Sequence, residues 1–439
     1  MFKALSNMFS IKELRERIIF TLLMLGVYRL AGSIWAPGVD VSKVSEMFAG
    51  VNKNLFDMMD MFTGGGIGNM TIMALGVMPN ISASIIIQLA ASVVPSLERL
   101  SREGEAGRNK INQYVRYLTV VICVVQGAIL ARSLVHNGIN MISPVLFVPL
   151  FIICLTAGTT FLMWLGEQIT QRGVGNGISL IIAAGILCRM PYAFKRLWQL
   201  HFAPGSDGSI AIGILMIVLF VVVVYSVILV IQGQRRIPVQ YARRVAGGGK
   251  TVPAHTSYIP LRLNQANVIP IIFAGALMIV PQALAQIVPG DWYTVRNIVN
   301  QFATPSSAGY LIVYAALVIF FTYFYTAIQF NPVQIADDFK KNGAFIPGIR
   351  PGKPTSDLWE ASMFRIPTAG ATFLAIIAVV PALITGRLHV DWTIASFMGG
   401  TGILIVVGVV LDTMQQIEAH LLMHQYDGFM QKGRLRGRY

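Results

Sequence analysis

Two short motifs in this sequence contain residue types that could support chemistry. Residues 246–251 read AGGGKT, but the phosphate-loop pattern GxxxxGK[ST] needs glycine at position 244, where the chain has Arg244. His420 and His424 are four residues apart on a predicted helix and could ligate a metal, yet the sequence offers no evident third ligand. We therefore expect no nucleotide site, no metal, no cofactor and no catalytic residue, and the protein is not expected to be an enzyme.

The composition instead indicates a membrane protein. Of the 439 residues, 55% are hydrophobic and only 12% are charged, whereas an ordinary soluble protein has about 25% charged residues. Ten apolar segments approach the roughly 20 residues that a membrane-spanning helix needs. They centre on residues 18–34, 70–94, 117–134, 144–165, 178–197, 210–231, 268–288, 310–330, 366–384 and 394–411. We predict an all-α polytopic membrane protein with ten transmembrane helices.

The basic residues predict the orientation of these helices. An even number of spans places both termini on one side, and the loops on that side carry 25 of the 34 Lys and Arg residues. Cytoplasmic loops are the ones enriched in Lys and Arg. Both termini are therefore expected in the cytoplasm.

A polar external loop divides the chain into two halves. Residues 203–209 separate an N-terminal half, residues 1–202 with spans one to five, from a C-terminal half, residues 210–439 with spans six to ten. Because each half has an odd number of spans, the two halves must have opposite orientations. Inverted repeats of this kind place a transport pathway at the interface between the repeats.

An ion-coupled secondary transporter with inverted repeats is one protein class that this architecture permits. Such transporters carry ionisable residues within the membrane. The candidates here all lie at the ends of spans: Arg29, Glu167, Arg387 and Asp412. Backbone carbonyls also bind ions, so this alternative is weakened and stays open.

Two cytoplasmic loops are longer than a plain connection needs. Residues 232–267 join spans six and seven, residues 331–365 join spans eight and nine, and both loops mix Arg and Lys with Pro and Gly. A simple membrane-surface loop is the plain interpretation of each. A pair of long loops on one face also suits a large cytosolic partner, and we favour that interpretation, with Arg243, Arg244 and Arg350 as contact candidates.

A short helix is predicted just before the second span. Its apolar side chains fall on one helical face, at Leu55, Met58, Met59 and Phe62. At 1.5 Å per residue, a helix over residues 55–63 is about 13 Å long against about 30 Å of hydrocarbon, so it cannot span. Gly64 is expected to end it in a left-handed conformation. A hinge follows, formed by Gly64, Gly65, Gly66 and Gly68, and the second span is expected to begin near Met70. A helix lying at the outer interface is the alternative.

Five long motifs together resemble the SecY family, whose bacterial members form the central subunit of the Sec protein-conducting channel. In chain order they read FTGGGIGNMTIMALGVMPNISASIIIQL, RGVGNGISLII, RRIPVQYARRV, IPLRLNQANVIPIIFA and NGAFIPGIRPGKPT. The resemblance covers all ten predicted spans. It implies a central pore between the two five-helix halves and a lateral gate between spans two and seven. Unfolded polypeptides would cross the bacterial plasma (inner) membrane through the pore, and transmembrane segments would leave sideways into lipid.

The resemblance also implies roles for individual residues. The short helix would be a movable plug made of Leu55, Phe56, Asp57, Met58, Met59, Asp60, Met61, Phe62 and Thr63. A constriction ring would be formed by Ile81, Ile85, Ile182, Ile186, Ile272 and Ile405, although isoleucines four residues apart are more often plain packing. Cytosolic partners would dock through Arg243, Arg244, Lys250 and Arg350.

The implied partners follow from the same resemblance. They are the small membrane subunits SecE and SecG, the SecA motor ATPase, the ribosome, signal peptides, unfolded preproteins, membrane lipid, SecDF and YidC. Because the channel itself would be passive, the driving energy would come from SecA or from the ribosome.

Overall fold

The computed structural model describes most of the chain. The described residues are 11–40, 42–44, 60, 63–203, 209–241, 245–246, 250–251, 256–278, 281, 297, 299–302, 304, 307–329, 332–388 and 390–432. They fall into two compact units. The first unit comprises Met1–Gly213, Trp392–Phe397 and Ile405–Tyr439, and the second comprises Ile214–Asp391 and Met398–Leu404. The predicted division at residues 203–209 concerns the topology of the spans and stays a prediction.

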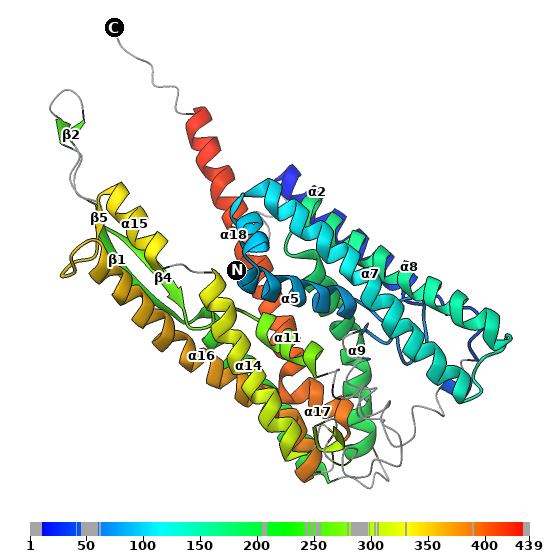
Figure 1. Ribbon diagram of the computed structural model, residues 1–439. Helices are drawn as coiled ribbons and strands as arrows, with labels where there is room; N and C mark the ends of the chain where they lie inside the picture. The colour runs from blue at the N-terminus through cyan, green and yellow to red at the C-terminus, as the bar shows by residue number, and fades with distance from the viewer. Residues whose placement is uncertain are drawn as a thin grey trace. The chain divides into compact units, whose positions relative to one another are not determined.

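The described part of the first unit is built from helices (Figure 1). They are α2 (Lys12–Ala31), α5 (Met78–Val93), α6 (Pro95–Arg102), α7 (Glu105–His136), α8 (Pro144–Arg172), α9 (Gly177–His201) and most of α18 (Thr401–Lys432). Helices α7 and α8 lie side by side, and α8 also packs against α2 and α9. Helix α8 is therefore the central element of this unit.

Close packing positions the backbone that precedes α5. Phe147, Phe151 and Leu155 of α8 are fully buried in a cluster that includes Met70 and Ala74. The rings of Phe147 and Phe151 stack with centroids 5.3 Å apart. One turn beyond the cluster, a Cβ atom at Gly158 would collide with the carbonyl oxygen of Ile72. The absence of a side chain at Gly158 thus lets the chain before α5 lie against α8.

The second unit combines helices with a small sheet. Its helices are most of α10 (Ile210–Gln232), α11 (Ile269–Leu277), α14 (Ala308–Gln329), α15 (Pro332–Asn342) and α16 (Lys353–Leu388), and α17 (Trp392–Gly399) contributes residues to both units. A three-stranded antiparallel sheet has the order β4-β1-β5, formed by β4 (Thr256–Arg262), β1 (Gln234–Tyr241) and β5 (Ala344–Phe345). The strands β2 (Val245–Ala246) and β3 (Lys250–Thr251) form a separate short hairpin.

The two long loops fold together instead of remaining plain connections. Strands β1 and β4 come from the first loop, β5, α15 and the start of α16 come from the second, and Figure 1 shows them grouped at one end of α16. In β1, the alternate residues Ile237 and Val239 are buried, as expected for a strand with one covered face. They share a core with Trp359 and Met363 of α16. The all-α prediction therefore holds for the spans, while the loops contain strands that the sequence analysis did not predict.

Most of the predicted spans correspond to described helices. Seven of these helices are long and apolar enough to cross a membrane. They are α7, α8, α9, α10, α14, α16 and α18. The pair α5 and α6, bent by 105°, would count as an eighth. Helix α2 has 20 residues and covers most of the first predicted span. Helix α11 lies in the seventh, and the rest of that span falls largely outside the described residues. The structure is consistent with ten spans without confirming each of them.

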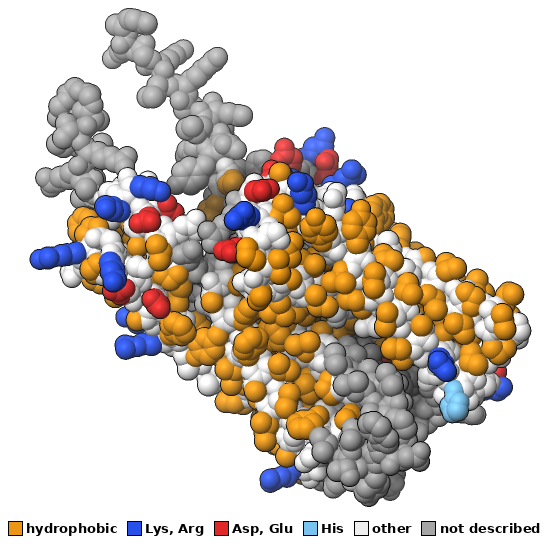
Figure 2. Space-filling model, viewed as in Figure 1, with side chains coloured by type: hydrophobic (Ala, Val, Ile, Leu, Met, Phe, Trp, Pro, Cys, Tyr) orange, Lys and Arg blue, Asp and Glu red, His pale blue; other side chains and the backbone are white. Residues whose placement is uncertain are grey.

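The surfaces of the helices match a hydrocarbon environment. Helix α10 exposes many large apolar side chains along its length, including Ile214, Val218, Val221 and Leu229. Figure 2 shows hydrophobic side chains spread along the helices, with most Lys and Arg side chains nearer the helix ends. A soluble protein does not expose apolar surface on this scale. The chain is therefore a multi-span membrane protein.

The packing at Gly158 makes a prediction about stability. Replacing Gly158 with alanine adds a methyl group that must displace the backbone of Ile72, so we expect a loss of about 1–3 kcal/mol in the free energy of unfolding, as for other overpacked cores. The measurement is the thermal midpoint of the detergent-purified protein.

A matched control is available at Gly26 in α2. A Cβ atom there has nothing within 4 Å, so Gly26→Ala should leave the midpoint unchanged or raise it slightly. Equal midpoints for Gly26→Ala and Gly158→Ala would contradict the close approach.

Candidate functional site

The six ring candidates are all buried aliphatic side chains. Ile81 and Ile85 lie in α5, Ile182 and Ile186 in α9, Ile272 in α11 and Ile405 in α18. Their exposed fractions range from 0% at Ile405 to 7% at Ile81. Five belong to the first unit and Ile272 to the second. Burial of this kind fits both a closed ring and plain core packing, so their pore role stays a prediction.

Most of the plug candidates lie outside the described residues, namely Leu55, Phe56, Asp57, Met58, Met59, Met61 and Phe62. Asp60 and Thr63 are described, and both are helical and buried. The structure therefore gives the C-terminal end of the predicted plug helix.

The end of this helix has the geometry expected from its glycines. Gly64 has φ of +66°, so the prediction of a left-handed residue at this position is confirmed. The backbone N–H of Gly65 donates to the carbonyl oxygen of Asp60 at 3.0 Å. A left-handed glycine with a hydrogen bond across five residues is the pattern that ends many helices.

The start of the second span was predicted wrongly. The expectation was a helix from near Met70, but α5 begins at Met78. Residues 64–77 form turns, in which Met70 and Gly76 have positive φ angles of 44° and 56°. Pro79 lies in the first turn of α5, where a missing backbone N–H costs nothing. The hydrophobic pattern of residues 70–94 did not distinguish the apolar turns before Met78 from the apolar helix that follows.

The glycine segment is an ordered turn with close neighbours. The Arg29 guanidinium of α2 donates to the carbonyl oxygen of Gly64 at 2.9 Å. A Cβ atom at Gly64 would lie 2.8 Å from Cα of Gly185 in α9. Glycine is thus needed at position 64 both for its φ angle and for contact with α9. Movement at this turn stays a prediction.

A buried ion pair joins this turn to α9. The carboxylate of Asp60 pairs through Oδ2 with the guanidinium of Arg189. Its other oxygen, Oδ1, accepts the backbone N–H of Gly68 at 2.7 Å, and Thr63 Oγ1 lies 3.5 Å from it. The side chain of Asp60 is 5% exposed and that of Arg189 is 22% exposed. Both carboxylate oxygens therefore have partners, as a buried charge requires.

Arg189 is the functional candidate that the sequence analysis missed. The charges considered there were those at span ends, and three of them have structural partners. Arg29 binds Gly64, Glu167 accepts two hydrogen bonds from Arg116, at 2.9 and 2.6 Å, and Asp412 accepts one from Gln416 at 3.4 Å. Arg189 lies within the apolar α9, and a charge in such a helix is itself a signal of function. Its partner, however, could not be identified from sequence spacing.

The docking candidates are only partly described. Arg243 and Arg244 lie outside the described residues, and Lys250 is described only as part of the backbone of β3. Arg350 is exposed, and its carbonyl oxygen accepts the hydroxyl of Thr355 at 2.9 Å. The structure thus places Arg350 on the surface between β5 and α16, and its binding role stays a prediction.

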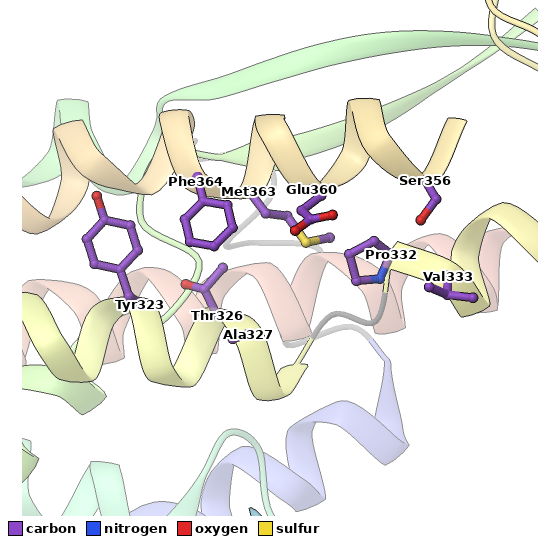
Figure 3. Close-up of a pocket in the computed structure, with 9 residues that line it drawn as sticks. All are labelled: Tyr323, Thr326, Ala327, Pro332, Val333, Ser356, Glu360, Met363 and Phe364. Carbon is purple, nitrogen blue, oxygen red and sulfur yellow. The ribbon is translucent and has the colours of Figure 1, made fainter. Parts of the chain in front are cut away.

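A cleft in the second unit lies between α14, α15 and α16 (Figure 3). It has a volume of about 300 Å³, and its walls include Tyr323, Met363 and Phe364, with Glu360 at one side. The lining combines one carboxylate with apolar and hydroxyl groups and provides no nucleophile paired with a base. Among the described residues, no group of three His, Cys, Asp or Glu side chains could hold a metal ion.

The sequence of the chain matches one family along most of its length. A sequence model of the SecY family matches residues 71–414. The protein translocase subunit SecY of Chlamydia trachomatis is 43% identical over 456 aligned residues, which cover 99% of this chain and 99% of that protein.

Two solved structures have a similar fold. One concerns a SecY protein whose plug domain stabilises the closed state of the translocation channel and maintains a membrane seal. Its TM-score is 0.61 at 19% identity, and the match covers 92% of both chains. The other is an idle yeast Ssh1 complex bound to the yeast 80S ribosome. Its TM-score is 0.61 at 14% identity, covering 91% of this chain and 89% of that chain.

The structural likeness supports the fold, and the sequence likeness supports the family. The family match extends over more than half of the chain, and the relative from Chlamydia trachomatis aligns over nearly all of it. The resemblance found in the five motifs is thereby confirmed. The chain belongs to the SecY family.

Proposed function

We propose that this protein is the channel-forming subunit of a Sec-type translocase in the bacterial plasma membrane. It passes unfolded polypeptides across the membrane and releases transmembrane segments sideways into lipid. The observation that carries this proposal is the 43% identity, over 99% of the chain, to a protein named as a translocase subunit. The ion-coupled transporter is not favoured, because the relatives at about 40% identity over the full length are named as translocase subunits and the charges at Arg29 and Glu167 have structural partners.

The proposed pore is closed by a ring of six aliphatic side chains, Ile81, Ile85, Ile182, Ile186, Ile272 and Ile405. Such a ring offers no fixed hydrogen-bond partner, so it can accept many polypeptide sequences. An ion entering a narrow apolar constriction would lose its hydration, which is heavily penalised. Each of the six side chains is aliphatic and buried.

The proposed plug adds a second barrier. It comprises residues 55–63, which end at the ordered glycine turn, with Gly64, Gly65, Gly66 and Gly68 as the hinge on which the plug moves. The solved SecY protein with a described plug domain supports this role. A signal peptide would leave through the lateral gate that the family resemblance implies between spans two and seven, because burial of its apolar surface in lipid is favourable.

The proposed energy source is a cytosolic partner, because the channel itself is passive. SecA or the ribosome would dock on the second unit, where the sheet and α15 extend the ends of α14 and α16 and Arg350 is exposed. Arg243, Arg244 and Lys250 would add positive charge to the same loops. SecE and SecG would complete the membrane complex, SecDF and YidC would assist it, and both termini would lie in the cytoplasm.

The direct test is reconstitution of the chain with its small membrane subunits in proteoliposomes. With SecA and ATP, we expect an unfolded preprotein to become protected from external protease. Saturable uptake of a small solute, without preprotein protection, would instead establish the transporter. Purification without any small subunit, and without binding to ribosomes, would also count against the proposal.

The ring makes a prediction about ion leak. Replacing Ile81, Ile85, Ile182 and Ile272 together with threonine lowers the cost of hydrating the constriction. Lowering the free-energy barrier to ion passage by about 1.4 kcal/mol raises the rate of ion passage about tenfold. We therefore expect the resting conductance across a planar bilayer to increase by about tenfold or more.

The matched control replaces four exposed isoleucines with threonine, at Ile153, Ile214, Ile312 and Ile376. This variant has the same change in composition but should keep the resting conductance of the original protein. If the ring variant conducts no more than the control variant, the ring assignment is wrong.

The docking proposal predicts an effect of charge reversal at Arg350. Arg350→Glu places a negative charge on the proposed docking surface, and we expect affinity for SecA and for ribosomes to fall about tenfold, equivalent to about 1.4 kcal/mol. The measurement is the dissociation constant for the membrane-reconstituted complex.

Arg387 provides the control for this reversal. It is also an exposed arginine, but it lies at the other end of α16. Arg387→Glu should leave both affinities unchanged, and an equal loss in the two variants would show a general charge effect in place of docking.

A further inference from the structure

The ion pair of Asp60 and Arg189 joins two elements that the proposed mechanism requires to separate. Asp60 belongs to the last turn of the proposed plug, and Arg189 belongs to α9. The pair is largely withdrawn from water, since the Asp60 side chain is 5% exposed. A plug that moves out of its resting position must break this contact or carry α9 with it.

The guanidinium of Arg189 also covers the glycine turn. A Cβ atom at Gly65 would lie 3.3 Å from both Nε and Nη2 of Arg189, and one at Gly68 would lie 3.4 Å from Nη2. The same Gly68 donates its backbone N–H to Asp60. One side chain of α9 therefore pairs with the end of the proposed plug and lies beside two glycines of the proposed hinge, Gly65 and Gly68.

We propose that Asp60 and Arg189 form an electrostatic latch that holds the plug in its closed position, with Arg189 as a gating residue. This inference rests on the proposed channel function. In a dry, closed channel the pair is strong, because Coulomb attraction increases as the local dielectric constant falls. When water and a polypeptide enter the channel, the same attraction weakens and both charges become hydrated. The latch thus favours closure at rest and releases during translocation.

The energetic cost of removing one partner of the ion pair also predicts that the channel opens more easily without it. Loss of Arg189 leaves the Asp60 carboxylate buried without its counter-charge, which is strongly destabilising for the closed arrangement. Movement of the plug toward water relieves that penalty. Neutralising either partner should therefore increase the fraction of channels open without substrate.

The test measures resting conductance of the full complex in planar bilayers without preprotein. We expect Arg189→Gln and Asp60→Asn each to raise it at least about tenfold, which corresponds to a shift of about 1.4 kcal/mol. Because both variants remove the same contact, the double variant should leak far less than the product of the single effects. Arg189→Lys keeps the charge and should leak less than Arg189→Gln.

Arg116→Gln is the matched control. It breaks a different ion pair of the same unit, which joins Arg116 of α7 to Glu167 of α8. Neither of these two residues is a partner of Asp60 or Arg189 in the contacts of the latch. The thermal midpoints of all variants are compared in detergent, so that a leak caused by general unfolding is recognised by a lowered midpoint. A leak in Arg116→Gln equal to that in Arg189→Gln, at equal midpoints, would overturn the latch.

Protection of a preprotein in proteoliposomes separates this inference from the function on which it rests. If the original protein translocates and Arg189→Gln leaks no more than the original, the latch is wrong and the channel stands. If the original protein does not translocate, the proposed function fails and the latch fails with it.

Discussion

Backbone N–H and C=O groups need hydrogen-bond partners within the protein wherever water is absent. In hydrocarbon, helices meet this requirement within a single segment. The turn between α2 and α5 must meet it by other means, because residues 64–77 are not helical. Ala36 N–H donates to Met70 O at 2.8 Å, and Ile72 N–H donates to Ile34 O at 3.0 Å. Non-helical backbone is thus tolerated because it is buried against protein and hydrogen-bonded.

The same constraint governs charges in the turn. A buried carboxylate is stable only with a counter-charge and hydrogen-bond donors, and Asp60 obtains them from Arg189 and Gly68. Close approach of Gly64 to Gly185 brings the turn against α9. The turn is also held by the hydrogen bond from Arg29 to the carbonyl oxygen of Gly64 and by backbone hydrogen bonds such as that from Gly65 to Asp60. A plug that moves away from this turn, as we propose, would have to break the contact of Asp60 with Arg189.

Beyond the hydrocarbon, water can hydrogen-bond to the backbone, and the chain there forms a sheet as well as helices. Helix α16 has 36 residues, about 54 Å at 1.5 Å per residue, so it extends well beyond the roughly 30 Å of hydrocarbon. Its first turns carry Trp359 and Met363, which pack on β1 and β4. Two loops that are distant in sequence therefore share one core, and the region where Arg350 is exposed is folded rather than loose.

The fold class and the positions of most spans could be predicted from the amino-acid sequence, because apolar runs of about 20 residues follow directly from bilayer thickness. The family could be predicted from five long motifs, and the left-handed Gly64 from the conformational preference of glycine. The start of α5 at Met78, the sheet formed by the two loops and the pairing of Arg189 with Asp60 became visible in the folded chain alone. Those features depend on contacts between distant segments, and neither periodicity nor spacing encodes such contacts.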